Sequence, residues 1–331
     1  MKFLKWLGLV LLLLIIAYFL GPQPSTPDYS LKLPVVPSDP VKLEKYIADH
    51  EALYNIKNDN EARIIWANDS VKEKKSYAVV YIHGFSASQE EGDPVHITFS
   101  KKFGYNLFLN RLAEHGIDTT EPLAGVTAEK LWNSAKEAYV IGKQLGDSVI
   151  LMATSTGATL ALKLAAEYPG ISGLILLSPN IAINDAKAWM LNNHWGMQIA
   201  KFIKGKYNHA RDTTALYAKY WDPKYRIESV VQLQELLEST MKESTFKKIH
   251  SPVLVLYYYK DEANQDKVVK VPAMKRMFAQ LATPDSLKRM LAVPNAGDHV
   301  IGSYVKSKDV ETVNREIERF AKEILKLKTA M

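Results

Sequence analysis

The sequence SVILMATSTGATLALKLAAE, residues 148–167, joins an apolar run to a helix-like stretch through the pentad ATSTG at residues 153–157. Ser155 at the centre of such a junction is typical of the sharp strand-to-helix turn called a nucleophile elbow. Small neighbours are needed because the strand and the helix pass close together and the backbone of the turn is strained. Ala153 stands where Gly is customary, and a pentad of this kind also fits an ordinary turn, so its surroundings must decide.

Short apolar runs alternate with amphipathic stretches on both sides of the pentad. Three runs, residues 78–82, 149–152 and 253–256, are apolar without interruption, as expected of central strands buried on both faces. The alternation predicts an α/β fold with a mostly parallel sheet flanked by helices. We expect strands at 63–67, 77–82, 106–109, 148–154, 173–178, 253–259 and 288–293, and helices at 40–54, 128–144, 156–167, 268–281 and 310–327.

The regular spacing breaks once, between the strand that ends near Ser178 and the strand that begins at Val253. About seventy residues are too many for one crossover, so we expect an inserted helical cap at about residues 180–250. This stretch is rich in aromatic residues, which either form the core of the cap or line an apolar pocket. They are Trp189, Trp195, Tyr207, Tyr217, Tyr220, Trp221 and Tyr225.

The N-terminal residues 1–20 differ from the rest of the chain. Lys2 and Lys5 precede an uncharged run whose helix would be about 27 Å long, close to the thickness of a bilayer core. The exit from this run is bulky rather than small-x-small, which favours an uncleaved membrane anchor over a cleaved signal, the alternative being secretion. Lysines before the span predict a cytoplasmic N-terminus and an extracytoplasmic body. Residues 21–40 then form a proline-rich tether, and residues 41–331 form the main domain.

Composition narrows the chemistry. The net charge of +6 is spread over 331 residues without a basic block, so the sequence does not predict a nucleic-acid partner. The absence of cysteine excludes disulfides, thiolate metal sites and a cysteine nucleophile.

A seryl nucleophile needs a base, and the base needs an orienting acid. Of eight histidines, His299 alone lies beyond the pentad in a turn that leaves the last predicted strand. In the chain order Ser, acid, His, this is where the base should stand. The other histidines are expected to be solvated or structural, with His50, His96 and His115 on surface helices or loops.

The acid should follow the strand that starts at Val253. Asp261 lies at the usual distance from the start of this strand, and Asp266 lies at the usual distance before the next helix. We choose Asp266, because the start of the helix fixes the height of the carboxylate beside His299, and we keep Asp261 as the alternative. Asp298 adjoins His299 and would need an awkward backbone path to reach the imidazole.

Acyl transfer also needs N–H donors for a developing oxyanion. One is expected from the backbone of Thr156, directly after the nucleophile, and one from Phe85, in the loop that follows the strand 78–82. Gly84 permits the turn of this loop. His83 is expected to hold the loop by hydrogen bonds rather than to act as a catalyst.

The chain resembles the α/β-hydrolase superfamily in four motifs. They are His83-Gly84-Phe85, the Ser155 pentad, the Asp-x-Val-Val segment at Asp266 and the Gly-x-His at His299. It is most similar to capped carboxylesterases and to the lysophospholipase or monoacylglycerol-lipase-like branch. The resemblance implies a central sheet of about eight strands, a cap over the site, two-step hydrolysis through an acyl-enzyme, and no metal or organic cofactor.

The sequence therefore predicts a serine hydrolase that cleaves carboxylic esters. Ser155 is expected to attack, His299 to carry the proton and Asp266 to orient His299, while Phe85 and Thr156 hold the oxyanion. The aromatic cap and the N-terminal segment favour lipid-like acyl substrates. Two alternatives remain: hydrolysis of peptide or thioester bonds on the same fold, and a non-catalytic, membrane-anchored binding module.

Overall fold

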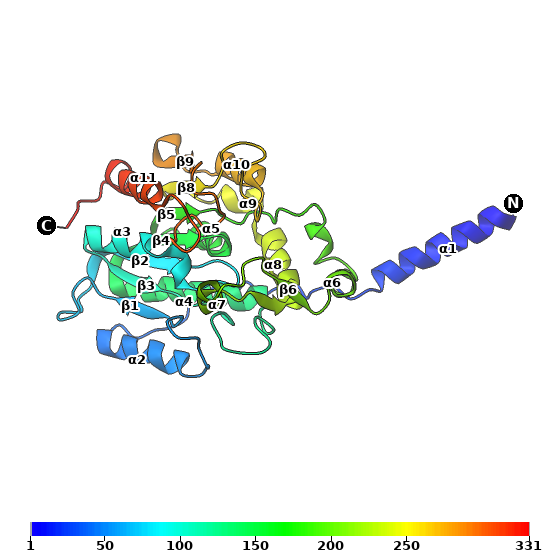
Figure 1. Cartoon of the computed structure of the whole chain (residues 1–331), viewed down its shortest axis with the longest axis horizontal. Helices are drawn as coiled ribbons and strands as arrows, with labels where there is room; N and C mark the ends of the chain where they lie inside the picture. Colours follow the sequence, from blue (N-terminus) through cyan, green and yellow to red (C-terminus); the bar gives the residue numbers. More distant parts are fainter. Residues whose placement is uncertain (1, 331) are drawn as a thin grey trace.

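The central feature of the fold is a seven-stranded sheet with the strand order β1-β3-β2-β4-β5-β8-β9 (Figure 1). The structure is a computed structural model that describes residues 2–330. All neighbouring strands are parallel except β1, which runs antiparallel to β3. The strands are β1 (Arg63–Ile65), β2 (Lys75–Ile82), β3 (Asn106–Leu109), β4 (Gly146–Thr154), β5 (Ile171–Leu177), β8 (Val253–Tyr257) and β9 (Lys288–Ala292).

Each of the seven predicted apolar runs overlaps one strand of this sheet, which confirms the predicted mostly parallel α/β architecture. The sheet of residues 2–330 has seven strands rather than the eight implied by the family resemblance. The alternation of side chains along β2 explains the layers. Val80 and Ile82 pack into one apolar cluster, and Val79 and Tyr81 pack into another on the opposite face.

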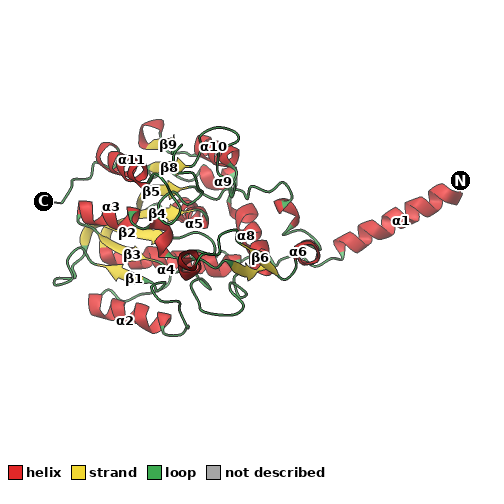
Figure 2. Cartoon of the chain, in the orientation of Figure 1, coloured by secondary structure: helices red, strands yellow, loops and turns green. Residues whose placement is uncertain are grey.

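Helices cover both faces of the sheet, as the red helices around the yellow strands of Figure 2 show. The cluster around Val80 includes residues of α2 (Pro40–Glu51), α4 (Ala128–Leu145), α5 (Thr156–Glu167) and α10 (Val271–Gln280). The cluster around Val79 includes residues of α3 (Val95–Phe103) and α11 (Val310–Glu323). Thr127 caps the N-terminus of α4, because its side chain accepts the Lys130 N–H.

The chain leaves the sheet after β5 and returns to it at β8. The intervening elements are η2 (Ala188–Met190), α6 (Gly196–Lys204), β6 (Tyr207–His209), α7 (Ala215–Tyr220), β7 (Lys224–Arg226), α8 (Ile227–Thr240) and α9 (Glu243–Phe246). We call this segment, residues 178–252, the cap. It is not purely helical, since β6 and β7 pair in a small antiparallel sheet.

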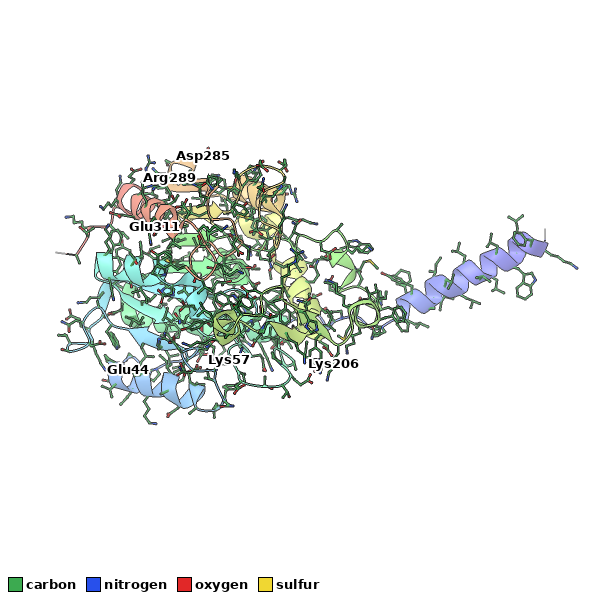
Figure 3. The ribbon with its side chains drawn as sticks, in the orientation of Figure 1. Glu44, Lys57, Lys206, Asp285, Arg289 and Glu311 are labelled. Atoms are coloured by element: carbon green, nitrogen blue, oxygen red, sulfur yellow. The ribbon has the colours of Figure 1, made fainter. Side chains whose placement is uncertain are left out.

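Ion pairs join the cap to the rest of the molecule. Lys57 Nζ lies 2.6 Å from Asp222 Oδ1, and Asp222 is almost fully buried. Lys206 Nζ lies 2.8 Å from the Glu121 carboxylate at the other side of the cap. Figure 3 labels both lysines. The buried Lys57–Asp222 pair contributes more to holding the cap on the sheet domain than the exposed Lys206–Glu121 pair does, because water screens the exposed charges.

The N-terminal helix α1 (Lys2–Phe19) extends away from the body and buries none of its residues (Figure 1). It is long and apolar enough to cross a membrane by length and composition. The proline-rich stretch that follows is extended, but its second half lies against the body. Trp132 and Lys136 of α4 donate to the carbonyl oxygen of Ser30, and the Tyr29 hydroxyl hydrogen-bonds Ser239.

Candidate active site

Ser155 lies between the end of β4 and the start of α5, on a backbone with φ 52° and ψ −116°. A positive φ is unfavourable for a residue with a Cβ atom, so the surroundings must hold this turn. The Ser155 N–H donates to Leu177 O, and the Ser155 carbonyl accepts the N–H of Asn180. These bonds tie the turn to β5 and to the loop after it.

Gly157 explains why the pentad ends in Gly. A Cβ atom at this position would lie 2.0 Å from the carbonyl oxygen of Ile82, at the end of β2. The helix can therefore start here only without a side chain. Ala153, at the first position of the pentad, is fully buried in the β4 ladder opposite Ile82 and Leu176, so its methyl group is accommodated in the core.

His299 and Asp266 meet at the same edge of the sheet. His299 Nδ1 lies 2.6 Å from Asp266 Oδ2. The other carboxylate oxygen of Asp266 accepts the backbone N–H groups of Val268 and Val269, and the residue is only 1% exposed. Asp266 is thus held rigidly on one side and bonds the imidazole on the other.

Asp261 has a different role in the structure. Its carboxylate accepts hydrogen bonds from the backbone and side chain of Asn264, and it is exposed in a surface turn. The four residues between the two aspartates, 262–265, therefore lie in a loop before the aspartate that pairs with His299.

The charges around His299 favour its protonated form. Burial by itself lowers the pKa of His299, but the charge and hydrogen bond of Asp266, together with the charges of Glu91 and Asp298, outweigh burial and raise this pKa above its ordinary value. An imidazole stabilised as imidazolium is suited to accept a proton from a nucleophile. In residues 2–330 no hydrogen bond joins Ser155 to His299.

The two expected oxyanion donors lie at the start of α5 and in the loop after β2. Thr156 is the first residue of α5, and Phe85 follows Gly84 in the loop after β2. The N–H groups of Phe85 and Thr156 make no hydrogen bond within residues 2–330. The loops are close together, because a Cβ atom at Gly84 would lie 3.0 Å from Ser155 Cβ.

His83 holds the loop after β2, as expected. Its Nε2 accepts the Leu112 N–H, so the proton on its Nδ1 is donated to the Gly84 carbonyl 2.8 Å away. The expectation of a surface position for His96 and His115 is wrong, since both are fully buried. His115 packs against the rings of His83 and Phe85, and polar flanking residues hid this burial from the sequence pattern.

Glu91 is a residue of the site that sequence reasoning missed. It belongs to the short helix η1 (Gln89–Gly92), is 2% exposed, and accepts the Gly84 N–H through Oε2 at 2.5 Å. Burial raises the pKa of Glu91 to about 7, against the charge of His299 and the Gly84 hydrogen bond, which lower it. Only the position of Glu91, eight residues after the His83 that opens the loop, could have drawn attention to it.

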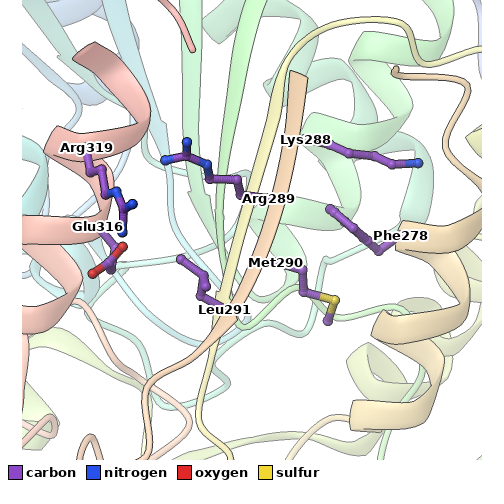
Figure 4. Close-up of a pocket in the computed structure, with 7 residues that line it drawn as sticks. All are labelled: Phe278, Lys288, Arg289, Met290, Leu291, Glu316 and Arg319. Atoms are coloured by element: carbon purple, nitrogen blue, oxygen red, sulfur yellow. The ribbon is translucent and has the colours of Figure 1, made fainter. Parts of the chain in front are cut away.

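Ser155 is 5% exposed. Trp221 and Tyr220 of the cap pack with Ala87, two residues after Phe85, and with Val300, the residue after His299. Figure 4 shows a separate hollow of about 400 Å³ at the edge strand β9, lined by Lys288, Met290 and Arg319 among others. It contains none of the residues of the candidate site, and its charged rim is typical of a protected sheet edge. Residues 2–330 contain no cluster of three His, Asp or Glu side chains arranged to hold a metal.

Comparison with known proteins supports the same fold. The protein family described as serine aminopeptidase, S33, matches residues 137–294. A thermostable monoacylglycerol lipase from Bacillus sp. (strain H-257) is 23% identical over 250 residues, which cover 76% of this chain and 92% of the relative.

Two solved structures share the architecture. One comes from the study of LipS and LipT, two metagenome-derived lipolytic enzymes, with a TM-score of 0.63, 16% identity, and coverage of 81% of this chain and 99% of that one. The monoacylglycerol lipase of Paleococcus ferrophilus has a TM-score of 0.58 at 15% identity, with coverage of 79% and 98%. The strand order of the sheet and the likeness to these lipolytic enzymes show that the chain has the α/β-hydrolase fold.

Proposed function

We propose that the chain is a serine hydrolase that cleaves carboxylic esters with apolar acyl groups. The observation that carries this proposal is the placement of a strained Ser155 turn and a buried Asp266–His299 pair at one edge of the sheet. Strain of this kind persists only where the surrounding structure holds it, and it concentrates at reactive sites.

In the proposed reaction Ser155 Oγ attacks the ester carbonyl carbon while His299 Nε2 takes its proton. The N–H groups of Phe85 and Thr156 hold the negative charge on the former carbonyl oxygen. The tetrahedral intermediate collapses, the alcohol leaves with the proton from His299, and an acyl-enzyme remains on Ser155. Water then attacks this acyl group with His299 as the base, and the carboxylic acid is released.

The preference for apolar acyl groups rests on the walls of the site and on the relatives. Phe85 packs edge-on against Tyr225 of the cap, with ring centroids 5.6 Å apart, and Trp221 is buried nearby. Aromatic walls of this kind suit acyl chains. Monoacylglycerol lipases occur among both the sequence relatives and the structural neighbours.

The same proposal places the enzyme at a membrane. The end of α1 is joined to the cap, because Trp195 donates to the carbonyl oxygens of Ala17 and Pro22 through its side chain and its backbone. A hollow of about 700 Å³ lies at this junction, lined by apolar side chains of α1 and α6.

On α6, which begins one residue after Trp195, Phe202 is 91% exposed and Ile203 is 69% exposed. Such an apolar helix face beside a candidate span is suited to the surface of a bilayer. Lys2 and Lys5 favour a cytoplasmic N-terminus, which puts the catalytic domain on the extracytoplasmic side; the alternative is secretion after cleavage.

Labelling with a fluorophosphonate and hydrolysis of p-nitrophenyl esters of increasing acyl length test the proposal together. We expect labelling and hydrolysis by the wild type, rates that rise with acyl length up to an optimum, and loss of both in Ser155→Ala. A folded wild type that is neither labelled nor active would overturn the proposal and favour the non-catalytic binding module.

A second candidate function is hydrolysis of peptide bonds, which is favoured by the description of the matching family as serine aminopeptidases. Aminoacyl p-nitroanilides separate the two candidates. Faster turnover of these amides than of any ester would replace the esterase by a peptidase that uses the same residues.

A further inference from the structure

Glu91 combines three features that a surface carboxylate does not have: burial, a backbone hydrogen bond in the loop after β2, and proximity to the candidate nucleophile. A Cβ atom at Gly84 would lie 2.8 Å from both carboxylate oxygens of Glu91 and 3.0 Å from Ser155 Cβ. The carboxylate and the seryl side chain therefore both lie close to the position that a Cβ atom of residue 84 would occupy. Burial of a carboxylate is costly, so its presence here needs a reason.

The helix that carries Glu91 is fixed by its own packing. Its last residue, Gly92, fits between Tyr81 and His96, since a Cβ atom there would lie 2.4 Å from the Tyr81 ring and 2.6 Å from His96 Cδ2. His96 in turn bonds the Gln89 carbonyl oxygen at 2.9 Å. The carboxylate of Glu91 therefore projects from a rigid base.

The groups near Glu91 come from three parts of the fold. They are the Gly84 N–H in the loop after β2, His299 and Asp298 after β9, and Trp221 of the cap. The charge of Glu91 is also felt by the hydroxyl groups of Tyr81 in β2 and Tyr217 in α7. Of these groups, the Gly84 N–H and His299 belong to the reacting part of the site.

We propose that Glu91 is a positioning residue of the candidate ester-hydrolysis site. Its carboxylate accepts the Gly84 N–H and so fixes the His83–Gly84 peptide, directly before the peptide whose Phe85 N–H would face the substrate carbonyl. It also places a second negative charge beside His299. The inference rests on the function proposed above. It assigns to Glu91 the orientation of the oxyanion loop, while bond making and breaking stay with Ser155 and His299.

Three consequences follow. Removal of the Glu91 carboxylate should lower kcat more than it raises KM. The reason is that the Phe85 N–H stabilises the transition state more than the bound substrate, so a poorly oriented Phe85 N–H weakens mainly the transition state. Glutamine keeps an acceptor oxygen for Gly84, so it should preserve most of kcat. Glutamine also removes the charge that helps to keep His299 protonated, so the acid limb of the pH profile should move to lower pH.

Glu91→Ala and Glu91→Gln, studied in the full-length chain with a p-nitrophenyl ester, test these consequences. We expect Glu91→Ala to lower kcat by about 10- to 100-fold with KM changed less than about threefold. We expect Glu91→Gln to stay within about threefold of the wild-type kcat, with its acid limb shifted to lower pH. Glu90→Gln is the matched control, since it makes the same charge change on the same helix, and Glu90 makes no hydrogen bond to Gly84.

Wild-type kcat in Glu91→Ala would overturn the inference. So would equal losses in Glu91→Ala and Glu91→Gln with an unshifted pH profile, since this pattern indicates a general packing role. Thermal unfolding of each variant separates misfolding from mispositioning. If the wild type itself neither hydrolyses esters nor labels at Ser155, the proposed function fails first, and that failure is distinct from a failure confined to the Glu91 variants.

Discussion

Two regions of the molecule depart from the usual distribution of side chains in opposite ways. Near Ser155, at the carboxyl ends of the strands, ionisable residues are buried, whereas on the outer face of the cap large apolar residues are exposed. At the sheet edge, the ionisable residues Asp266 and Glu91 are at most 2% exposed. On α6 the apolar Phe202 and Ile203 stand largely in solvent. Buried ionisable groups and exposed large apolar side chains both carry a cost, so both point to function rather than to folding. The role of the residues around Ser155 must therefore be tested by measuring reaction rates and stability. The role of the α6 face must be tested by measuring its contact with lipid.

The largest expected effect separates the two aspartates of the loop after β8. Asp266→Asn should lower kcat by about 10³- to 10⁴-fold, because an amide no longer fixes the imidazole in the tautomer that the reaction needs. Asp261→Asn should change kcat less than about twofold, since the Asp261 carboxylate bonds only its own turn. Steady-state rates with one p-nitrophenyl ester check both. Loss of activity in Asp261→Asn alone would contradict the geometric assignment of the acid.

The next effect compares a glycine of the sheet edge with one of the cap. Gly157→Ala should destabilise the fold by about 3 kcal/mol or more, because the new Cβ meets the Ile82 carbonyl oxygen at 2.0 Å and that backbone lies in the central sheet. Gly205→Ala, at the end of α6, should cost about 1 kcal/mol, since its φ of 81° strains an alanine while no atom lies within 4 Å. Urea unfolding gives both values. Equal losses of unfolding free energy in the two variants would mean that the close approach of α5 to β2 does not make Gly157→Ala more destabilising.

A third effect concerns the pH dependence of stability. Burial raises the pKa of Glu91 to about 7, from an ordinary value of 4.5. A raised pKa means that the folded state binds the proton more tightly than the unfolded chain, so the stabilisation is complete below pH 4.5 and is lost as the pH rises to about 7. Glu91→Gln removes this loss. Relative to wild type, it should therefore be more stable at pH 8 than at pH 4.5, by about 1–3 kcal/mol.

The free energy of unfolding at the two pH values, compared between variant and wild type, measures this effect because the other titrating groups cancel. Glu262→Gln, at an exposed position, serves as the control for the loss of one carboxylate elsewhere in the chain. A Glu91→Gln difference that does not depend on pH would mean that the pKa of Glu91 is not raised in the folded protein.

The sequence predicted the sheet well for a physical reason. Strands such as β4 are buried on both faces, so their apolar runs are continuous and visible without an alignment. Ser155, Asp266 and His299 could be named as candidates because each follows a strand at the carboxyl end of a mostly parallel sheet. That Asp266 rather than Asp261 pairs with His299 agrees with the choice made from the helix start, while catalysis by these residues stays a prediction.

What the sequence hid was burial produced by packing between distant segments. Glu91 lies in a polar run that reads as a surface loop, and it is buried only because Gly92 packs against Tyr81 and His96. The small sheet of β6 and β7 was missed within the cap for a related reason. Its strands have three residues each, too few to establish an alternating pattern.

The smallest expected effect lies on the cap and uses the absence of cysteine from the chain. Phe202→Cys, labelled with an environment-sensitive fluorophore, should leave the melting temperature within about 1 °C of wild type, since the side chain is almost fully exposed. In vesicles that hold the full-length protein, its emission should move to shorter wavelength and should be quenched by brominated lipid. The α6 face would then lie in the interfacial layer rather than in water.

Asp285→Cys carries the same label at a position whose side chain is 97% exposed and which lies away from α1 and α6 (Figure 3). Its emission should stay that of a water-exposed label with or without vesicles. Identical emission at positions 202 and 285 would separate the cap from the bilayer, so that α1 would act as a tether alone. A shift confined to position 202 would mean instead that the exposed apolar side chains of the cap and the buried carboxylates of the sheet edge serve one purpose. The exposed apolar side chains of the cap would hold the enzyme at the lipid surface. The buried carboxylates would position the groups that act on an ester taken from the bilayer.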